Sequence, residues 1–286
     1  METPSRFGYI AAGAFSGIVL QAALLGVITI QTFLYFERFS KDHFFQRTVI
    51  GFLWLMQMFQ VIASLYVYIW IIEHSGKLTI RWIDTIYQLS MVICSAIVQF
   101  LFILRLYRLS GSIWLPTLIV FLTLGQFGTG VVLFVKANFT HGPQSILFSK
   151  RPLTVSWLTL EAVADLVIGF AMSYFLQKRR TGFRRMDTVL RKLTAYAIST
   201  GLLTGILALG AMFSVAFHSP QFIPMIFIFV LGGVYTTSLL ANLHSRSRLW
   251  SELRFEGDNG ISIHLSRLPS RHVEGHHSNE GTDQAQ

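Results

Sequence analysis

Charged side chains are scarce in this sequence. Asp, Glu, Lys and Arg make up 13% of its 286 residues, about half the share that soluble domains carry. The mean hydropathy is +0.54, which excludes a water-exposed globular surface for most of the chain. The formal net charge of +9 raises the question of nucleic acid. The positive residues gather beside the ends of apolar stretches, however, so we expect no nucleic-acid partner.

Cysteine and proline are also rare. The single cysteine, Cys94, excludes an intramolecular disulfide, and a lone thiol inside an apolar stretch is typically a small packing residue. Of the seven prolines, Pro116 and Pro224 fall in the first turns of expected helices, where a missing N–H does little harm. The apolar stretches are therefore expected to form helices without interior breaks.

Long apolar runs are what the sequence has in abundance, from Phe7 to about Leu243. A run of about 18 residues or more crosses a hydrocarbon core of ~30 Å as a helix. Helices are required because unpaired backbone groups in lipid each cost several kcal/mol. The first run is too long for a signal peptide, so we expect it to be retained. The predicted fold class is all-α, an integral membrane bundle of seven transmembrane helices at 8–36, 48–72, 82–107, 113–135, 153–177, 193–217 and 222–243.

Segments 1–7 and 244–286 flank this predicted domain. The second is polar and is expected to be a disordered tail, because it has too few apolar residues to form a core. Its His272, His276 and His277 form a loose cluster without a neighbouring cysteine, so we expect no bound metal.

Lys and Arg are distributed unevenly between the connections. Fifteen lie in the set that includes the C-terminal flank, and six lie in the opposite set. The excess predicts an N-terminus outside the cytosol and a cytosolic C-terminus. Which cellular membrane holds the protein stays open.

Glu161 and Asp165 are the clearest candidates for chemistry. They lie four residues apart and so share one face of the fifth predicted helix. Asp165 falls near the bilayer midplane, where a charge costs about 2.5–3.5 kcal/mol. Repulsion between two carboxylates on one face favours protonation of at least one. The pair is either a proton, cation or ligand site facing the bundle interior, or a neutral structural contact between helices.

Amide side chains occur inside several apolar runs. They line a polar cavity or, more commonly, hydrogen-bond one helix to another. The glycine pairs Gly13/Gly17 and Gly201/Gly205 are expected to be intramolecular packing sites. The amides are Gln21, Gln31, Gln57, Gln60, Gln88, Gln99 and Gln126.

A basic connection follows the fifth predicted helix. It sets the topology, attracts anionic lipid, or binds a cytosolic protein partner through residues 178–192. On the opposite side Asn138 begins a glycosylation sequon, close to a predicted helix end. The positive residues of the connection are Lys178, Arg179, Arg180, Arg184, Arg185, Arg191 and Lys192.

Motifs of known classes are absent. The last predicted helix has no lysine, which excludes a retinal Schiff base, and no Asp-Arg-Tyr or Asn-Pro-x-x-Tyr motif supports a rhodopsin-like receptor. Without a Walker loop, Gly-x-Ser-x-Gly or His-Glu-x-x-His, we expect neither an enzyme nor a cofactor.

Short motifs along residues 10–248 carry a resemblance to a known family. They are Gln99-Phe100, Arg105-Leu-Tyr-Arg-Leu-Ser110, Ser156-Trp157, Ala164-Asp165, Arg180-Thr-Gly-Phe183, Asp187, Tyr196, Thr200-Gly-Leu-Leu-Thr204, Tyr235 and Ser238-Leu-Leu-Ala241. With these motifs the chain resembles a fungal (basidiomycete) family of seven-helix membrane proteins defined by a domain of unknown function, the 6534 type. The resemblance implies the fold and a membrane location, and it favours Asp165 over Glu161. It implies no activity.

Two positions depart from that family's pattern. Gln57 and Gln60 stand where the second helix often has an acid and a histidine, and Leu243-His244 replaces a Leu-Asn pair. A polar site shared by the family would therefore have a different charge here.

Three functional hypotheses follow. The first is a receptor-like or sensory protein, which rests on fold-level analogy from odd helix number, outside N-terminus and basic connection. The second is a transporter or proton-coupled carrier that uses the intramembrane acids, and the third is a membrane scaffold.

Overall fold

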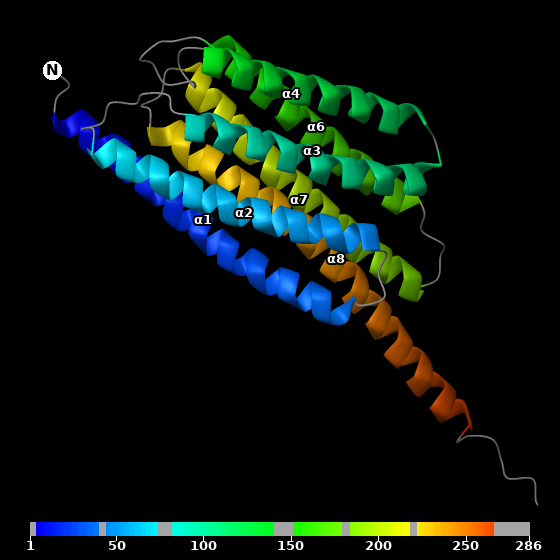
Figure 1. Ribbon diagram of the computed structural model, residues 1–286. Coiled ribbons are helices and arrows are strands. Elements are labelled where there is room, and N and C mark those ends of the chain that lie inside the picture. Colours follow the sequence, from blue (N-terminus) through cyan, green and yellow to red (C-terminus); the bar gives the residue numbers. More distant parts are fainter. Residues whose placement is uncertain are drawn as a thin grey trace, which may run out of the picture. The chain divides into compact units, whose positions relative to one another are not determined.

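The described part of the chain is helical. The computed structural model describes residues 4–39, 44–73, 82–111, 113–139, 151–178, 184–217 and 222–265. The helices in these ranges are α1 (Pro4–Arg38), α2 (Phe44–Glu73), α3 (Trp82–Ser110), α4 (Trp114–Phe139), α6 (Arg151–Lys178), α7 (Arg184–Ala216) and α8 (Phe222–Leu265) (Figure 1).

Six of the described helices are long and apolar enough to cross a membrane. They are α1, α2, α3, α4, α6 and the part of α8 between Ile223 and His244. In α7 the apolar stretch that the structure describes, Gly201–Ala216, is shorter. The protein is therefore a multi-pass membrane protein surrounded by lipid, which confirms the predicted location.

Helices α6 and α8 lie in the interior of the bundle. In the most apolar part of each helix, 67% of the residues are buried in α8, 56% in α6 and 22% in α4. Helix α6 packs against α3, α4 and α7, and its contact with α7 is the most extensive between any two described helices. In these two helices, more of the apolar stretch is therefore shielded from lipid than in the other described spans.

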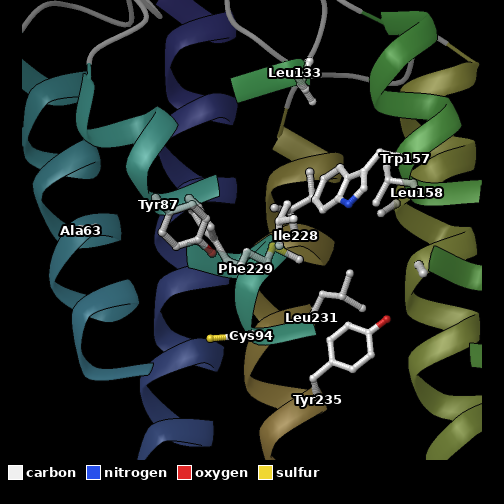
Figure 2. Packing of buried hydrophobic residues seen from close by; sticks show 14 of the residues in the cluster. Ala63, Tyr87, Cys94, Leu133, Trp157, Leu158, Ile228, Phe229, Leu231 and Tyr235 are labelled. Carbon is white, nitrogen blue, oxygen red and sulfur yellow. The ribbon is translucent and has the colours of Figure 1, made fainter. Parts of the chain in front are cut away.

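The apolar core joins side chains from several helices. Trp157 and Leu158 of α6 meet Ile228 and Phe229 of α8 in one buried cluster (Figure 2). The ring of Tyr87 on α3 packs edge-on against Phe229, with 5.5 Å between ring centroids. Aromatic pairs in this arrangement contribute about 0.5–1.5 kcal/mol beyond area burial.

Most helix ends follow local rules. Every proline in a described helix lies within the first three residues, including the expected Pro116 and Pro224. Helix α3 ends at Ser110, and the next residue, Gly111, has a left-handed φ of 65°. The N–H of Gly111 donates to the carbonyl of Tyr107 at 3.3 Å. Glycine adopts this conformation without a Cβ clash.

Two helices extend beyond the predicted spans. Helix α7 begins at Arg184 rather than 193, and α8 ends at Leu265 rather than 243. Neither extension contains a proline, and lengthening an existing helix costs far less than starting one. By its contacts the chain divides into Met1–Ser247 and Arg248–Gln286. Residues 266–286, which include the end of the predicted tail, lie outside the described residues.

Candidate functional site

The two acids of α6 point into the bundle. Glu161 and Asp165 lie one helical turn apart, and their exposed fractions are 0% and 4%. The face that they share is thus turned away from lipid. Burial inside protein is where intramembrane acids are normally found, because lipid solvates a carboxyl group poorly.

Asp165 binds side chains from neighbouring helices. The hydroxyl of Tyr235 on α8 donates to its Oδ2, and Figure 2 shows this hydroxyl turned toward the side where Leu158 of α6 lies. The amide Nε2 of Gln99 on α3 donates to its Oδ1 at 3.2 Å. Thr204 on α7 also interacts with the carboxyl group. All three partners are uncharged, so hydrogen bonds rather than an ion pair hold Asp165 here.

Glu161 lies in a different environment. Within the described residues neither of its carboxyl oxygens has a hydrogen bond of acceptable geometry. The hydroxyls of Tyr235 and Ser95 are close enough to interact with it. Ser95 in turn accepts a hydrogen bond from Nε2 of Gln126 on α4, at 3.1 Å. Glu161 is therefore a buried acid whose oxygens remain available to a proton or another donor.

We refer to Gln99, Glu161, Asp165, Thr204 and Tyr235 as the acid cluster. Its members come from α3, α6, α7 and α8, so changes at the cluster affect four helices together. The local reason is helix periodicity, because Glu161 and Asp165 share one face of α6 while Gln99 and Thr204 lie on the faces of α3 and α7 that pack against it.

A small cavity adjoins Asp165. Its volume is about 20 Å³, room for about one water-sized occupant. Polar and apolar side chains of four helices surround it. The lining residues are Val98, Gln99, Phe102, Asp165, Ile168, Gly169, Met172, Gly201, Thr204, Tyr235 and Ser238.

The other predicted glutamines lie elsewhere. Gln57 and Gln60 are buried on α2, but neither lines the cavity. The Nε2 of Gln60 lies 3.8 Å from the Sγ of Cys94, and Gln21 accepts a hydrogen bond of 2.9 Å from Ser64. The structure thus brings Gln99 to the acids and leaves Gln57 and Gln60 in a separate polar region.

Three cavity residues were not among the predicted site residues. Thr204, Tyr235 and Ser238 were missed because a hydroxyl in an apolar helix gives no periodic signal. Each belongs, however, to the motifs that carry the family resemblance, as do Gln99 and Asp165. That shared membership was the signal that would have found them.

The basic connection is only partly described. Lys178 ends α6 and is exposed, while Arg179 and Arg180 lie outside the described residues. The backbone of α7 includes the remaining positive residues, but their side chains lie outside the description. The role of the basic connection stays a prediction. Its positive residues on α7 are Arg184, Arg185, Arg191 and Lys192.

Asn138 lies in the last turn of α4. Its Nδ2 donates to the carbonyl of Phe134 at 2.9 Å, and its Oδ1 accepts a hydrogen bond from Thr85 at 3.3 Å. Glycosylation there stays a prediction. Among the described residues no group of three His, Cys, Asp or Glu side chains is placed to hold a metal ion. The tail histidines lie beyond that part of the chain.

Comparison with known protein families gives a match over part of the chain. Residues 161–248 match the family described as "Family of unknown function (DUF6534)". Neither the curated proteins nor the solved structures contain a match to this chain. The matched segment begins at Glu161 and covers less than half of the chain. It contains both acids together with Thr204, Tyr235 and Ser238, so over this segment the chain is similar to a family without an assigned activity.

Proposed function

We propose that this protein is a receptor-like or sensory membrane protein without enzymatic activity, in which the acid cluster sets the packing of the helices. The proposal rests on the observation that the carboxyl group of Asp165 accepts hydrogen bonds from α3 and α8 at the same time. A change in the charge of this carboxyl group, or in what binds to it, alters the contacts of several helices together. Local electrostatic events of this kind are how many switches act.

Helix α7 links the acid cluster to the basic connection, because it contains residues of both. At Gly201 an added Cβ would lie 2.9 Å from the Cα of Gly169 on α6, so the two backbones touch beside the cavity. The same helix begins at Arg184, about 30 Å from Thr204 at 1.5 Å per residue. Movement of α7 against α6 at the cluster would therefore move the residues that we expect to bind a cytosolic partner.

The size of the cavity favours a sensory role over transport. Sites for small molecules usually enclose about 300–1,000 Å³, whereas this cavity is about 20 Å³. A carrier in the same conformation would hold no solute larger than water at Asp165.

We infer further that all seven helices cross the membrane, with the N-terminus outside and the C-terminus in the cytosol. The uneven distribution of Lys and Arg supports this arrangement. The match over residues 161–248 and the motifs outside it support membership of the whole chain in the fungal seven-helix family.

Hydrogen exchange tests the coupling between the cluster and α7. We expect Asp165→Asn in the purified full chain to raise amide exchange across residues 184–198, because the variant changes the contacts at the inner part of the same helix. Tyr235→Phe serves as a second variant if Asp165→Asn does not fold.

The matched control is Gly17→Ala. Its added Cβ would meet the Phe229 side chain at 2.9 Å, on the α1–α8 contact rather than on the contact between α6 and α7. If Gly17→Ala raises exchange at residues 184–198 as much as the cluster variants do, general destabilisation explains the effect and the proposed coupling is rejected.

A proton-coupled carrier is the second candidate, and Glu161 is the observation that favours it. Both of its oxygens are buried without a hydrogen bond of acceptable geometry, one turn from a second acid. In proteoliposomes with a pH-sensitive dye, a carrier gives proton flux that Glu161→Gln and Asp165→Asn abolish. Flux equal to that of empty vesicles rejects this candidate.

A further inference from the structure

The two acids of the cluster have different partners. Both oxygens of Asp165 accept a hydrogen bond, Oδ1 from Gln99 and Oδ2 from Tyr235. An ionised carboxyl group is an acceptor only, and donors at both oxygens favour that form. Neither oxygen of Glu161 has such a donor, although the side chain is fully buried. Of the two acids, Asp165 is therefore better suited to be the carboxylate and Glu161 to hold a proton.

The charges around the pair lead to the same assignment. In the part of the chain that the structure describes, the polar side chains that act on the two acids are uncharged. Two carboxylates one helical turn apart would repel each other there, and each would bear the cost of a charge inside the membrane. One proton on the pair removes the repulsion. The uncharged side chains are those of Ser95 and Gln99 on α3, Thr204 on α7 and Tyr235 on α8.

The hydroxyl of Tyr235 interacts with both acids. It donates to the Oδ2 of Asp165, and it is close enough to Glu161 to interact with it as well. A hydroxyl oxygen accepts as well as donates, so a proton on Glu161 has the Oη of Tyr235 as an acceptor. The order Glu161, Tyr235, Asp165 is then a chain of hydrogen bonds that starts on a carboxylic acid and ends on a carboxylate.

The cavity extends this chain beyond Asp165. Its other lining residues on α6 all follow Asp165 in the sequence, so the cavity lies toward the basic connection, whereas Glu161 lies on the opposite side. The volume of about 20 Å³ fits one water. The Oε1 of Gln99 has no hydrogen-bond partner, and the hydroxyl of Ser238 also lines the cavity. A water there would donate to the amide oxygen and accept from the hydroxyl.

We propose that Glu161 and Asp165 share one proton, which the hydroxyl of Tyr235 transfers between them. In the transfer the O–H bond of Glu161 breaks and its proton binds the Oη of Tyr235, while the proton of Tyr235 moves to the Oδ2 of Asp165. Tyr235 stays neutral, and the negative charge moves from Asp165 to Glu161. A water in the cavity then exchanges the proton on Asp165 with the side of the basic connection. The inference goes beyond the proposed function, and it requires no proton flux across the membrane.

Infrared spectroscopy of the purified full chain in detergent micelles tests this relay, because a protonated carboxyl group and a carboxylate absorb at different frequencies. At neutral pH we expect a band of a buried protonated carboxyl group, which Glu161→Gln removes and Asp165→Asn keeps. In D₂O the band should shift as the proton exchanges with solvent. Tyr235→Phe should keep the band but slow its shift by roughly a hundredfold, because proton transfer by a positioned side chain contributes about 10²–10⁴-fold.

The direction of the change separates a relay from a structural role. A variant that only loosens the helices admits water and speeds the shift, whereas loss of the relay slows it. Tyr87→Phe is the matched control, because Tyr87 is a buried tyrosine on α3 outside the acid cluster. Its band should shift no more slowly than that of the unmodified chain. If Tyr235→Phe does not fold, Asp165→Asn replaces it, since the relay then lacks its second acid and the shift should be equally slow.

Two results would overturn the inference. A band that survives Glu161→Gln, or the absence of any such band in the unmodified chain, would show that Glu161 holds no proton. A shift in the folded Tyr235→Phe or Asp165→Asn variant as fast as in the unmodified chain would show that the proton exchanges by another route. Neither result affects the test of the coupling to α7, which measures backbone amides of residues 184–198.

Discussion

Asp165 is the side chain on which the polar groups of α3, α7 and α8 converge. Near the midplane an ionised carboxylate costs about 2.5–3.5 kcal/mol, whereas a hydrogen bond between membrane helices contributes about 0.6 kcal/mol on average. Its two direct bonds, from Gln99 and Tyr235, therefore offset only part of that cost. The remainder requires a proton that the carboxyl group binds or shares.

Replacing Tyr235 tests the value of its hydrogen bond. We expect Tyr235→Phe to lower the free energy of unfolding by about 1–3 kcal/mol, because a buried carboxyl oxygen loses its donor while the ring keeps its packing. Unfolding of the purified protein in mixed detergent micelles measures the change. Tyr174→Phe is the control, since Tyr174 on α6 is 61% exposed, and an equal loss in both variants would contradict the expectation.

Glycine brings helices α6 and α7 together. Besides the Gly201 contact with Gly169, a Cβ at Gly205 would meet the side chain of Leu166 at 3.0 Å. On α1, Gly17 lies against Phe229 in the same way. These contacts are the intramolecular packing expected of Gly17, Gly201 and Gly205. Close backbone approach is how membrane helices gain van der Waals contact without a hydrophobic driving force.

A methyl group added at Gly201 should push α6 and α7 apart. The Cβ of Gly201→Ala would clash with backbone, which cannot rotate away, so we expect a loss of about 1–3 kcal/mol in the free energy of unfolding. Gly128 on α4 has no such neighbour within 4 Å. Gly128→Ala should therefore be neutral or stabilising, by up to about 1 kcal/mol from helix propensity. Similar thermal midpoints for the two variants would show that the contact contributes little.

Among the residues that the structure describes, six helices qualify as membrane spans by length and composition. The seventh, α7, is 33 residues long, yet its described apolar stretch covers Gly201–Ala216, about 24 Å at 1.5 Å per residue. Whether α7 crosses determines where the C-terminus lies. With seven crossings the termini lie on opposite faces, and with six they lie on the same face.

Cysteine labelling of intact cells distinguishes these arrangements. The one native cysteine, Cys94, is 1% exposed, so introduced thiols can be labelled without background. We expect a membrane-impermeant maleimide to label Ser5→Cys on intact cells, and Ser278→Cys only after permeabilisation. Labelling of both positions from outside would show that α7 does not cross and would overturn the proposed orientation.

The expectations that held were those that depend on local chemistry. The first five predicted spans, from 8–36 to 153–177, agree with the helices to within a few residues, because apolar length and proline position act along one segment at a time. The last predicted span, 222–243, agrees with the apolar part of α8, Ile223–His244. The helix itself continues to Leu265, because polar residues end a membrane span without ending a helix. Whether Gln57 and Gln60 line a cavity or join two helices stayed open, because an amide inside an apolar run does not specify which neighbour it meets.

The order of residues by itself determines that the protein is a helical membrane protein, because an apolar segment in lipid can pair its backbone groups only within a helix. The position of Asp165 between Gln99, Thr204 and Tyr235 does not follow from that order. Those residues are separated by between 31 and 136 positions in the chain, and they meet because glycines and small side chains allow particular helix faces to approach. The cavity is a product of that packing, since four helices contribute to it and none contains it alone.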